Sequence, residues 1–208
     1  MGSVVMGAGR SGLAAARFLA AQGRPVVLTD SRPDPGPALE IELAKAGIPG
    51  VWGDHPLVLL EDCDELIISP GIPRTTPFVV EALARGVPVI GEVEVAHRLL
   101  RERKDGSRVL AVTGTNGKST TTDLIAHLLK ACDMPAVACG NLGTPLITAM
   151  VGAEAGTRFA DAQRPGGGVA GRAGALVNQH ASQRRSGSHG KDHSGAVAQM
   201  QDHAAGHA

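Results

Sequence analysis

The sequence has 208 residues, which is enough for one domain or two small ones. Apolar residues make up 43% of it, but one Trp and three Phe are its only aromatic residues, so a core must be built from Val, Leu, Ile and Ala. Basic and acidic residues number 20 each, and a formal net charge of zero gives no general attraction to nucleic acid or to an acidic membrane. A small molecule is therefore the expected partner.

The cysteines and the apolar segments bear on the compartment. Cys63, Cys132 and Cys139 form no C-x-x-C pair, which argues against a disulfide framework or a zinc site and indicates a reducing environment. The first residues break into glycines too early for a signal peptide, and no window approaches the roughly 20 continuous apolar residues of a membrane helix. We expect a cytoplasmic protein with no membrane partner.

Short apolar runs alternate with amphipathic stretches up to about residue 150. In chain order, the pattern predicts strands over residues 3–6, 25–29, 65–69, 87–90, 108–113 and 136–139. It predicts helices over 13–22, through Leu43 and Lys45, and over 77–85, 92–102 and 118–130. Strands and helices that alternate in this way predict an α/β fold with parallel sheets and right-handed crossovers.

Two changes of composition divide the chain. The polar stretch 104–107 reads as a linker, so we expect a Rossmann-like domain over 1–104 and the start of a P-loop ATPase-type domain over 105–152. Residues 153–208 contain few large apolar side chains, and such a segment buries too little surface to offset the entropy of ordering. We predict a disordered tail there, and a change of reading frame near codon 152 would also explain its composition.

A G-x-G-x-x-G turn follows the first predicted strand, with glycines at Gly7, Gly9 and Gly12. Gly7 allows the tight turn, Gly9 lets a phosphate approach the backbone, and Gly12 lets helix and sheet pack closely. The N–H groups at the start of the next helix favour an anion. Asp30 ends the second strand, where an acidic residue meets a ribose or a base in nucleotide-binding folds. The alternative is that the glycines only permit a turn and Asp30 only caps a loop.

The strongest signal is a second glycine loop, which runs from a buried strand into a helix. Its candidate ATP-binding residues are Gly114, Thr115, Asn116, Gly117, Lys118, Ser119 and Thr120. Backbone N–H groups can surround phosphate oxygens, Lys118 can neutralise the outer phosphates, and the Ser119 hydroxyl is placed to bind Mg²⁺. Val112 stands where the general phosphate-loop pattern has a glycine, so this is a shorter variant. The alternative, an ordinary loop with a surface lysine, fits the flanking strand and helix less well.

The segment T-G-T-N-G-K-S-T resembles the ATP loop of the Mur ligases. Four other segments complete the resemblance: the turn at 7–12, Ser-Pro-Gly-Ile at 69–72, Gly-Glu-Val-Glu at 91–94, and Gly-Asn-Leu-Gly-Thr-Pro at 140–145. Their order and spacing are most similar to those of the members that add D-glutamate. Folylpolyglutamate synthases share the ATP loop but lack a nucleotide-binding domain before it.

The resemblance implies which residues hold the substrate. The first domain would bind the UDP end of UDP-N-acetylmuramoyl-L-alanine, with Asn141 nearer the reacting end. The implied UDP-binding residues are Gly9, Ser11, Gly12, Asp30, Ser31, Arg32, Ser69, Pro70 and Gly71. Read without the family, Ser69-Pro70-Gly71 is also a plain turn signal, and Asn141 a loop-forming residue.

The resemblance also implies the reaction. The γ-phosphoryl group of ATP passes to the alanyl carboxylate, which leaves ADP, and D-glutamate then attacks the acyl phosphate with release of phosphate. Lys118 and the Mg²⁺ ligand Ser119 would be the catalytic residues, since phosphoryl transfer depends on positioning and charge neutralisation. We expect a monomer. The family's later magnesium glutamate, modified lysine and third domain have no counterpart in residues 153–208, so the chain is expected to be catalytically incomplete.

Two other function classes stay open. An NAD-dependent dehydrogenase would explain the turn at 7–12 with Asp30 but not residues 114–120. A non-catalytic nucleotide-binding fragment would explain both loops without turnover.

Overall fold

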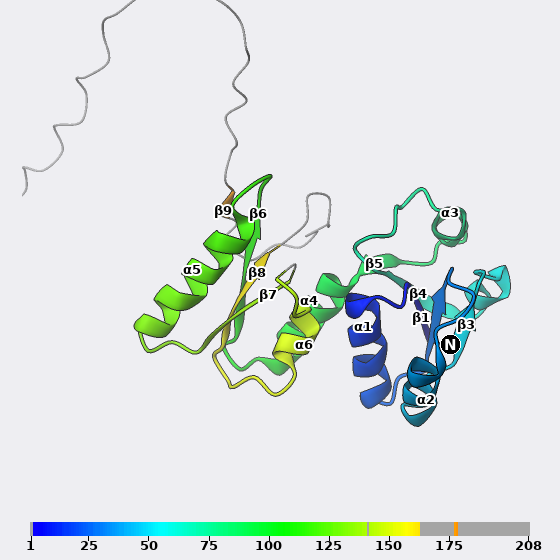
Figure 1. The fold of residues 1–208 in the computed structure, drawn as a ribbon, viewed down its shortest axis with the longest axis horizontal. Coiled ribbons are helices and arrows are strands. Elements are labelled where there is room, and N and C mark those ends of the chain that lie inside the picture. The colour runs from blue at the N-terminus through cyan, green and yellow to red at the C-terminus, as the bar shows by residue number, and fades with distance from the viewer. Residues whose placement is uncertain (1, 141, 163–176, 179–208) are drawn as a thin grey trace, which may run out of the picture.

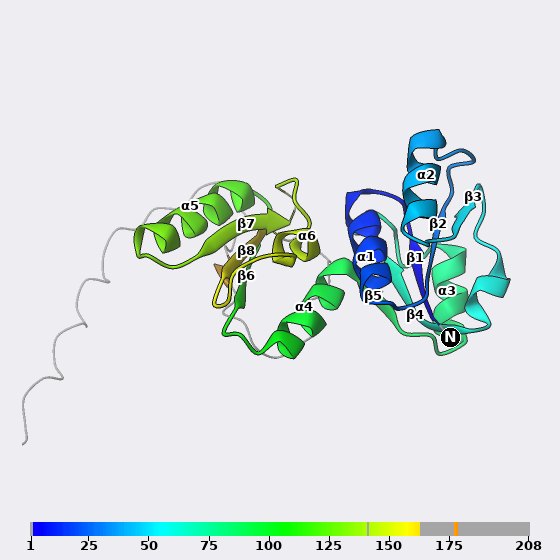
Figure 2. The ribbon, with the colours of Figure 1, turned by 90° about the horizontal axis from the view of Figure 1, so that it is seen from below.

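The computed structural model describes residues 2–140, 142–162 and 177–178, and these form two lobes joined by a helix (Figures 1 and 2). Each lobe contains one parallel sheet, as the alternating pattern predicted. The remaining residues, among them Asn141 and most of the predicted tail, lie outside the described part.

The first lobe is built on a five-stranded parallel sheet with the order β3-β2-β1-β4-β5. Its strands are β1 (Gly2–Met6), β2 (Val26–Asp30), β3 (Gly50–Trp52), β4 (Cys63–Ile68) and β5 (Val89–Gly91). The chain builds outward from β1 on one side and then crosses to β4 on the other. This reversal places the helices on opposite faces, since each crossover has the same hand.

Side chains cover both faces of this sheet. Helices α1 (Arg10–Ala21) and α2 (Pro37–Lys45) pack on one face through Ala16, Leu19 and Leu43. The short 3-10 helix η1 (Leu57–Leu60) and helix α3 (Pro77–Ala84) cover the other face through Leu60, Phe78 and Val79. Strands buried on both sides explain the nearly continuous apolar runs that predicted them.

The second lobe contains a four-stranded parallel sheet with the order β7-β8-β6-β9. Its elements are β6 (Arg108–Thr113), helix α5 (Lys118–Ala131), β7 (Ala136–Gly140), helix α6 (Leu146–Met150), β8 (Arg158–Ala162) and β9 (Val177–Asn178). Helix α5 packs on one face through Ala126 and Ile125. Helix α6 packs on the other, in the same apolar cluster as Cys139 and Phe159.

Helix α4 (Glu92–Arg103) joins the lobes, and its polar side chains hold both of them. On the first lobe, Arg98 pairs with the buried carboxylate of Glu65 at 2.6 Å. On the second, Glu92 accepts a hydrogen bond from the Ile147 N–H at 2.7 Å, and Arg103 donates to the Met150 carbonyl at 2.8 Å. These polar contacts thus attach α4 to strand β4 of the first lobe and to helix α6 of the second.

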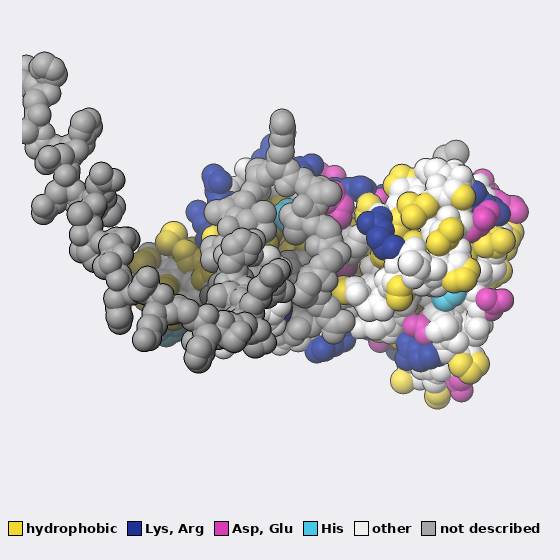
Figure 3. Space-filling model, turned by 90° about the horizontal axis from the view of Figure 1, so that it is seen from above, with side chains coloured by type: hydrophobic (Ala, Val, Ile, Leu, Met, Phe, Trp, Pro, Cys, Tyr) yellow, Lys and Arg dark blue, Asp and Glu magenta, His cyan; other side chains and the backbone are white. Residues whose placement is uncertain are grey.

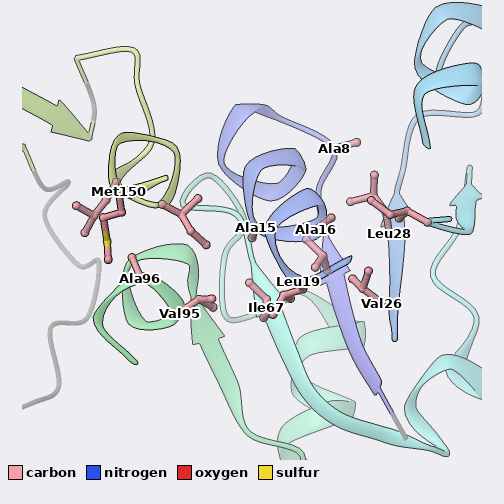
Figure 4. Close-up of a cluster of buried hydrophobic side chains, with 14 of the residues drawn as sticks. Ala8, Ala15, Ala16, Leu19, Val26, Leu28, Ile67, Val95, Ala96 and Met150 are labelled. Atoms are coloured by element: carbon pink, nitrogen blue, oxygen red, sulfur yellow. The ribbon is translucent and has the colours of Figure 1, made fainter. Parts of the chain in front are cut away.

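One apolar cluster runs through the junction between the lobes. It contains Ala15 of α1, Val95 and Ala96 of α4, and Met150 of α6 together with the core of the first lobe (Figure 4). The small alanines allow the helices to approach closely. The polar stretch 104–107 does lie between α4 and β6, but the packing is continuous across the junction.

The prediction that order ends at residue 152 was wrong for residues 153–162. Strand β8 lies between β6 and β7 and pairs with both, and Phe159 and Ala160 are fully buried. Its residues are mostly small, so the segment looked like the rest of the tail by composition. A central strand needs little apolar bulk of its own because neighbours cover both its faces.

Smaller elements were also missed. The sequence pattern did not predict β3, η1 or α6, which have three to five residues each. Helix α1 begins at Arg10, three residues before the predicted start. Among the described residues, no helix is long and apolar enough to cross a membrane.

Candidate functional site

The predicted substrate segments of the first lobe meet where the strand order reverses. Ser69 follows β4, and its backbone N–H donates to the Met6 carbonyl at 3.0 Å. Its hydroxyl donates to the Gly7 carbonyl at 3.0 Å, and the Gly7 N–H donates to the Thr29 carbonyl at 2.7 Å. The ends of β1, β2 and β4 are thereby tied together at the point where open α/β sheets bind ligands.

The glycines of the first turn have different surroundings. A Cβ atom on Gly12 would lie 1.9 Å from the Gly7 carbonyl oxygen, so only glycine fits there. A Cβ atom on Gly9 would meet nothing within 4 Å. Helix α1 has no side-chain cap and no acidic residue in its first turn, so its first N–H groups are available to an anion. Gly9 and Ser11 therefore border an open approach to that helix end.

Asp30 holds the glycine turn and Arg32 in place through hydrogen bonds. Its Oδ2 accepts a hydrogen bond from the Ala8 N–H at 2.6 Å, and its Oδ1 accepts from the Arg32 Nε at 3.0 Å. Arg32 also donates to the Ala8 carbonyl at 3.0 Å. Burial raises the pKa of Asp30, but the hydrogen bonds from Arg32 and Ala8 outweigh burial and hold the pKa below its ordinary value. Asp30 thus fixes the glycine turn and orients Arg32.

The remaining predicted residues of this site are at its rim. Ser31, Arg32, Pro70 and Gly71 are exposed at the carboxyl ends of β2 and β4. Asn141 lies outside the described residues, so its predicted contact stays a prediction.

The second glycine loop curves around the side chain of Lys118. The Lys118 Nζ donates to the carbonyls of Gly114 at 2.6 Å and Thr115 at 3.3 Å. Gly117 precedes α5 with a φ of +76°, and α5 has neither a side-chain cap nor an acidic residue in its first turn. An ammonium beside unpaired helix N–H groups fits a polyphosphate. Ser119 and Thr120 are exposed in this first turn.

Arg10, which sequence reasoning did not assign to the site, connects the first glycine turn to the second lobe. Its Nη1 donates to the carbonyl of Gly143 at 3.2 Å, and this hydrogen bond joins the start of α1 to the loop after β7. The G-x-G-x-x-G pattern carries no signal for this contact, because 133 positions separate the two residues.

A buried acidic pair lies at the junction, and this pair was also missed. Asp161 of β8 is fully buried, and burial with the nearby Glu92 raises its pKa to about 7. Burial also raises the pKa of Glu92, although the Ile147 N–H opposes this. A Cβ atom on Gly140 would lie 2.1 Å from Asp161 Oδ1, so the carboxyl group packs directly on the backbone of β7. Asp161 lies in the segment that was predicted to be disordered.

An open hollow of about 550 Å³ lies elsewhere, beside the amino ends of β4 and β5. Leu60, Cys63 and Arg85 line it, and none of the predicted site residues does. Because α/β sheets bind ligands at the opposite ends of their strands, we assign no function to this hollow.

Comparison with known proteins agrees with the motifs. Residues 2–91 match the family model described as Mur ligase MurD-like, N-terminal domain. Residues 2–91 are an N-terminal domain of the Mur ligase family. The curated UDP-N-acetylmuramoylalanine–D-glutamate ligase of Pelotomaculum thermopropionicum is 45% identical over 145 residues, which are 69% of this chain and 31% of the relative. Its counterpart in Geobacillus kaustophilus is 42% identical over 153 residues, which are 73% of this chain and 32% of the relative.

The chain therefore spans about a third of the length of the Mur ligases that it matches. Among solved structures, the Mur ligase MurC from Thermotoga maritima covers 65% of this chain and 30% of its own, with 25% identity and a TM-score of 0.44. The match to UDP-N-acetylmuramate:L-alanyl-gamma-D-glutamyl-meso-diaminopimelate ligase (MPL) from Neisseria meningitides covers 76% of this chain and 52% of that one, with 18% identity and a TM-score of 0.46.

Proposed function

We propose that this chain carries the UDP-binding and ATP-phosphate-binding parts of a cytoplasmic ligase that joins D-glutamate to UDP-N-acetylmuramoyl-L-alanine for peptidoglycan synthesis. The observation that carries the proposal is the loop around Lys118, with its ammonium beside the uncapped start of α5. The relatives named above support the acceptor, since their names specify D-glutamate.

The residues of the loop can perform the binding steps. The first N–H groups of α5 and the Lys118 ammonium neutralise the phosphates, and the exposed Ser119 hydroxyl is free to bind Mg²⁺. Bound ATP with Mg²⁺ supplies the phosphoryl group that activates the alanyl carboxylate. In the first lobe, the open approach at Gly9 and the start of α1 would hold the UDP diphosphate, and Arg32 would face the uridine.

The hydrogen bonds that Asp30 already accepts argue against the dehydrogenase alternative. In dinucleotide-binding folds an acidic residue at this position accepts a hydrogen bond from the ribose hydroxyl. Here both carboxylate oxygens already accept hydrogen bonds from Ala8 and Arg32. A titration of NADH fluorescence tests this alternative directly, and we expect no binding.

Isothermal titration of the 208-residue chain with ATP–Mg²⁺ and with UDP tests the proposal. Lys118→Ala should weaken ATP binding about tenfold or more, because it removes a charged donor worth about 1.5–3 kcal/mol. Lys130→Ala, an exposed lysine at the other end of α5, is the matched control. Neither change should alter the affinity for UDP. Equal ATP affinities in the two variants would contradict the proposal.

Turnover separates the complete enzyme from a binding fragment. With ATP, UDP-N-acetylmuramoyl-L-alanine and D-glutamate, we expect the 208 residues to bind nucleotides without releasing phosphate, since they correspond to about a third of the relatives. Phosphate release that depends on D-glutamate would show that these residues suffice for catalysis.

A further inference from the structure

We infer that Arg10 is a positioning residue that couples the UDP site of the first lobe to the loop 140–144 of the second. The inference rests on the proposed UDP site. The guanidinium of Arg10 is exposed at the first position of α1, and its Nη1 donates to the Gly143 carbonyl at 3.2 Å. Arg10 thus belongs to the turn that surrounds the diphosphate and also holds the loop that follows β7.

Among the described residues, the hydrogen bond from Arg10 is the one that joins the loop 140–144 to the first lobe. Two backbone hydrogen bonds lie within the loop: the Gly140 N–H donates to the Thr144 carbonyl at 2.8 Å, and the Gly143 N–H donates to the Gly140 carbonyl at 3.3 Å. These bonds shape the loop but do not place it against α1. Gly143 itself lies close to Arg10, since a Cβ atom there would be 3.4 Å from Nη1. Among the described residues, the Arg10 hydrogen bond is therefore the polar contact that orients the loop toward the glycine turn.

The chemistry of arginine explains how one residue can serve both sites. A guanidinium carries five N–H donors in a fixed plane, and one of them suffices for the Gly143 carbonyl. A diphosphate at the start of α1 would attract the same charge, and the described first turn holds no acidic residue that would compete for it. When the diphosphate fixes the guanidinium, the donor to Gly143 is fixed with it. UDP binding should then stabilise the loop 140–144 without touching the loop.

Hydrogen exchange of the 208-residue chain, measured by mass spectrometry with and without UDP, tests this coupling. In the unchanged chain, UDP should slow exchange in peptides that cover residues 140–144. In Arg10→Met, exchange there should be about fivefold faster without UDP, because a charge-assisted hydrogen bond is lost. UDP should still bind to this variant, but it should no longer slow hydrogen exchange in residues 140–144. Arg10→Lys should restore part of the response, since it keeps the charge without the planar fork.

Arg17→Met is the matched control, because Arg17 lies on the same helix and pairs with Glu42 on the surface, away from the glycine turn. It should leave both the exchange of the loop and its response to UDP unchanged. A loop that responds to UDP equally in Arg10→Met and Arg17→Met overturns the inference and leaves the proposed function intact. If Arg10→Met speeds exchange but the slowing by UDP persists, the contact is structural only, and the inference is overturned. An unchanged chain that does not bind UDP overturns the proposed function and the inference together.

Discussion

The two lobes have cores of different kinds. The first lobe buries large side chains on both faces of its sheet, with Leu19 and Leu28 on one face and Phe78 and Val79 on the other. In the second lobe, the described cluster under α5 contains only alanines as its buried members, and the bulkiest buried side chains, Phe159, Leu146 and Ile147, join the cluster shared with α1 and α4. The second lobe therefore depends on the first for much of its stability, and the following changes test this difference.

The largest effect is expected from Phe159→Ala. Phe159 is fully buried on β8 within the shared cluster, and removing a buried phenyl ring costs about 3–5 kcal/mol. Denaturant unfolding should show this loss, and hydrogen exchange should locate it in the second lobe. Phe78→Ala, a buried phenylalanine of the first lobe, is the counterpart. If Phe78→Ala left the second lobe protected, the proposed dependence would be wrong.

The second-largest effect on stability is expected from a change of pH, through the buried Asp161 at the junction. Burial beside Glu92 raises the pKa of Asp161 from 3.8 to about 7, so the folded chain holds a proton that the unfolded chain releases. Stability should therefore fall as pH rises from about 4 to about 7, by up to about 1.4 kcal/mol per unit, and level off above. Asp161→Asn should flatten this dependence and raise the melting temperature at pH 8. A steeper fall in that variant would contradict the assignment.

Asp30→Asn tests the first lobe at its ligand-binding edge. The change weakens the hydrogen bonds to Ala8 and Arg32, so we expect a loss of about 1–3 kcal/mol of stability and weaker UDP binding. The lowered pKa of Asp30 adds stability that is present above pH 4 and is lost as pH falls through the folded pKa. Denaturant titrations at pH 3 and pH 7 should differ less in the variant. An equal difference would show that Asp30 is not the responsible group.

The smallest effect on stability is expected on the outer face of α5. Leu124 and Leu128 are about half exposed there, one helical turn apart. Changing both to glutamate should shift the unfolding free energy by no more than about 0.5 kcal/mol, while solubility should rise. By contrast, the face of the first lobe in Figure 3 mixes apolar and charged side chains. A large loss of stability would show that this face of α5 is packed in solution.

The sequence predicted the parallel sheets and the loops at their carboxyl ends because buried strands and glycine turns leave strong local patterns. Gly12 and Gly117 stand where the structure needs them. Strand β8 could not be predicted in this way, because its place between β6 and β7 depends on pairing with distant residues. The same holds for the contact of Arg10 with Gly143 and for the buried Asp161. Such features arise from packing, which local periodicity does not record.

The double attachment of α4 has a practical consequence for dissecting this molecule. A cut in the stretch 104–107 would leave Arg98 bound to Glu65 on one piece, while the carbonyls that Arg103 serves would go with the other. Each half would then present a bare apolar surface and unmatched polar groups to water. Separately produced halves should aggregate, or should recover native behaviour only when they are mixed.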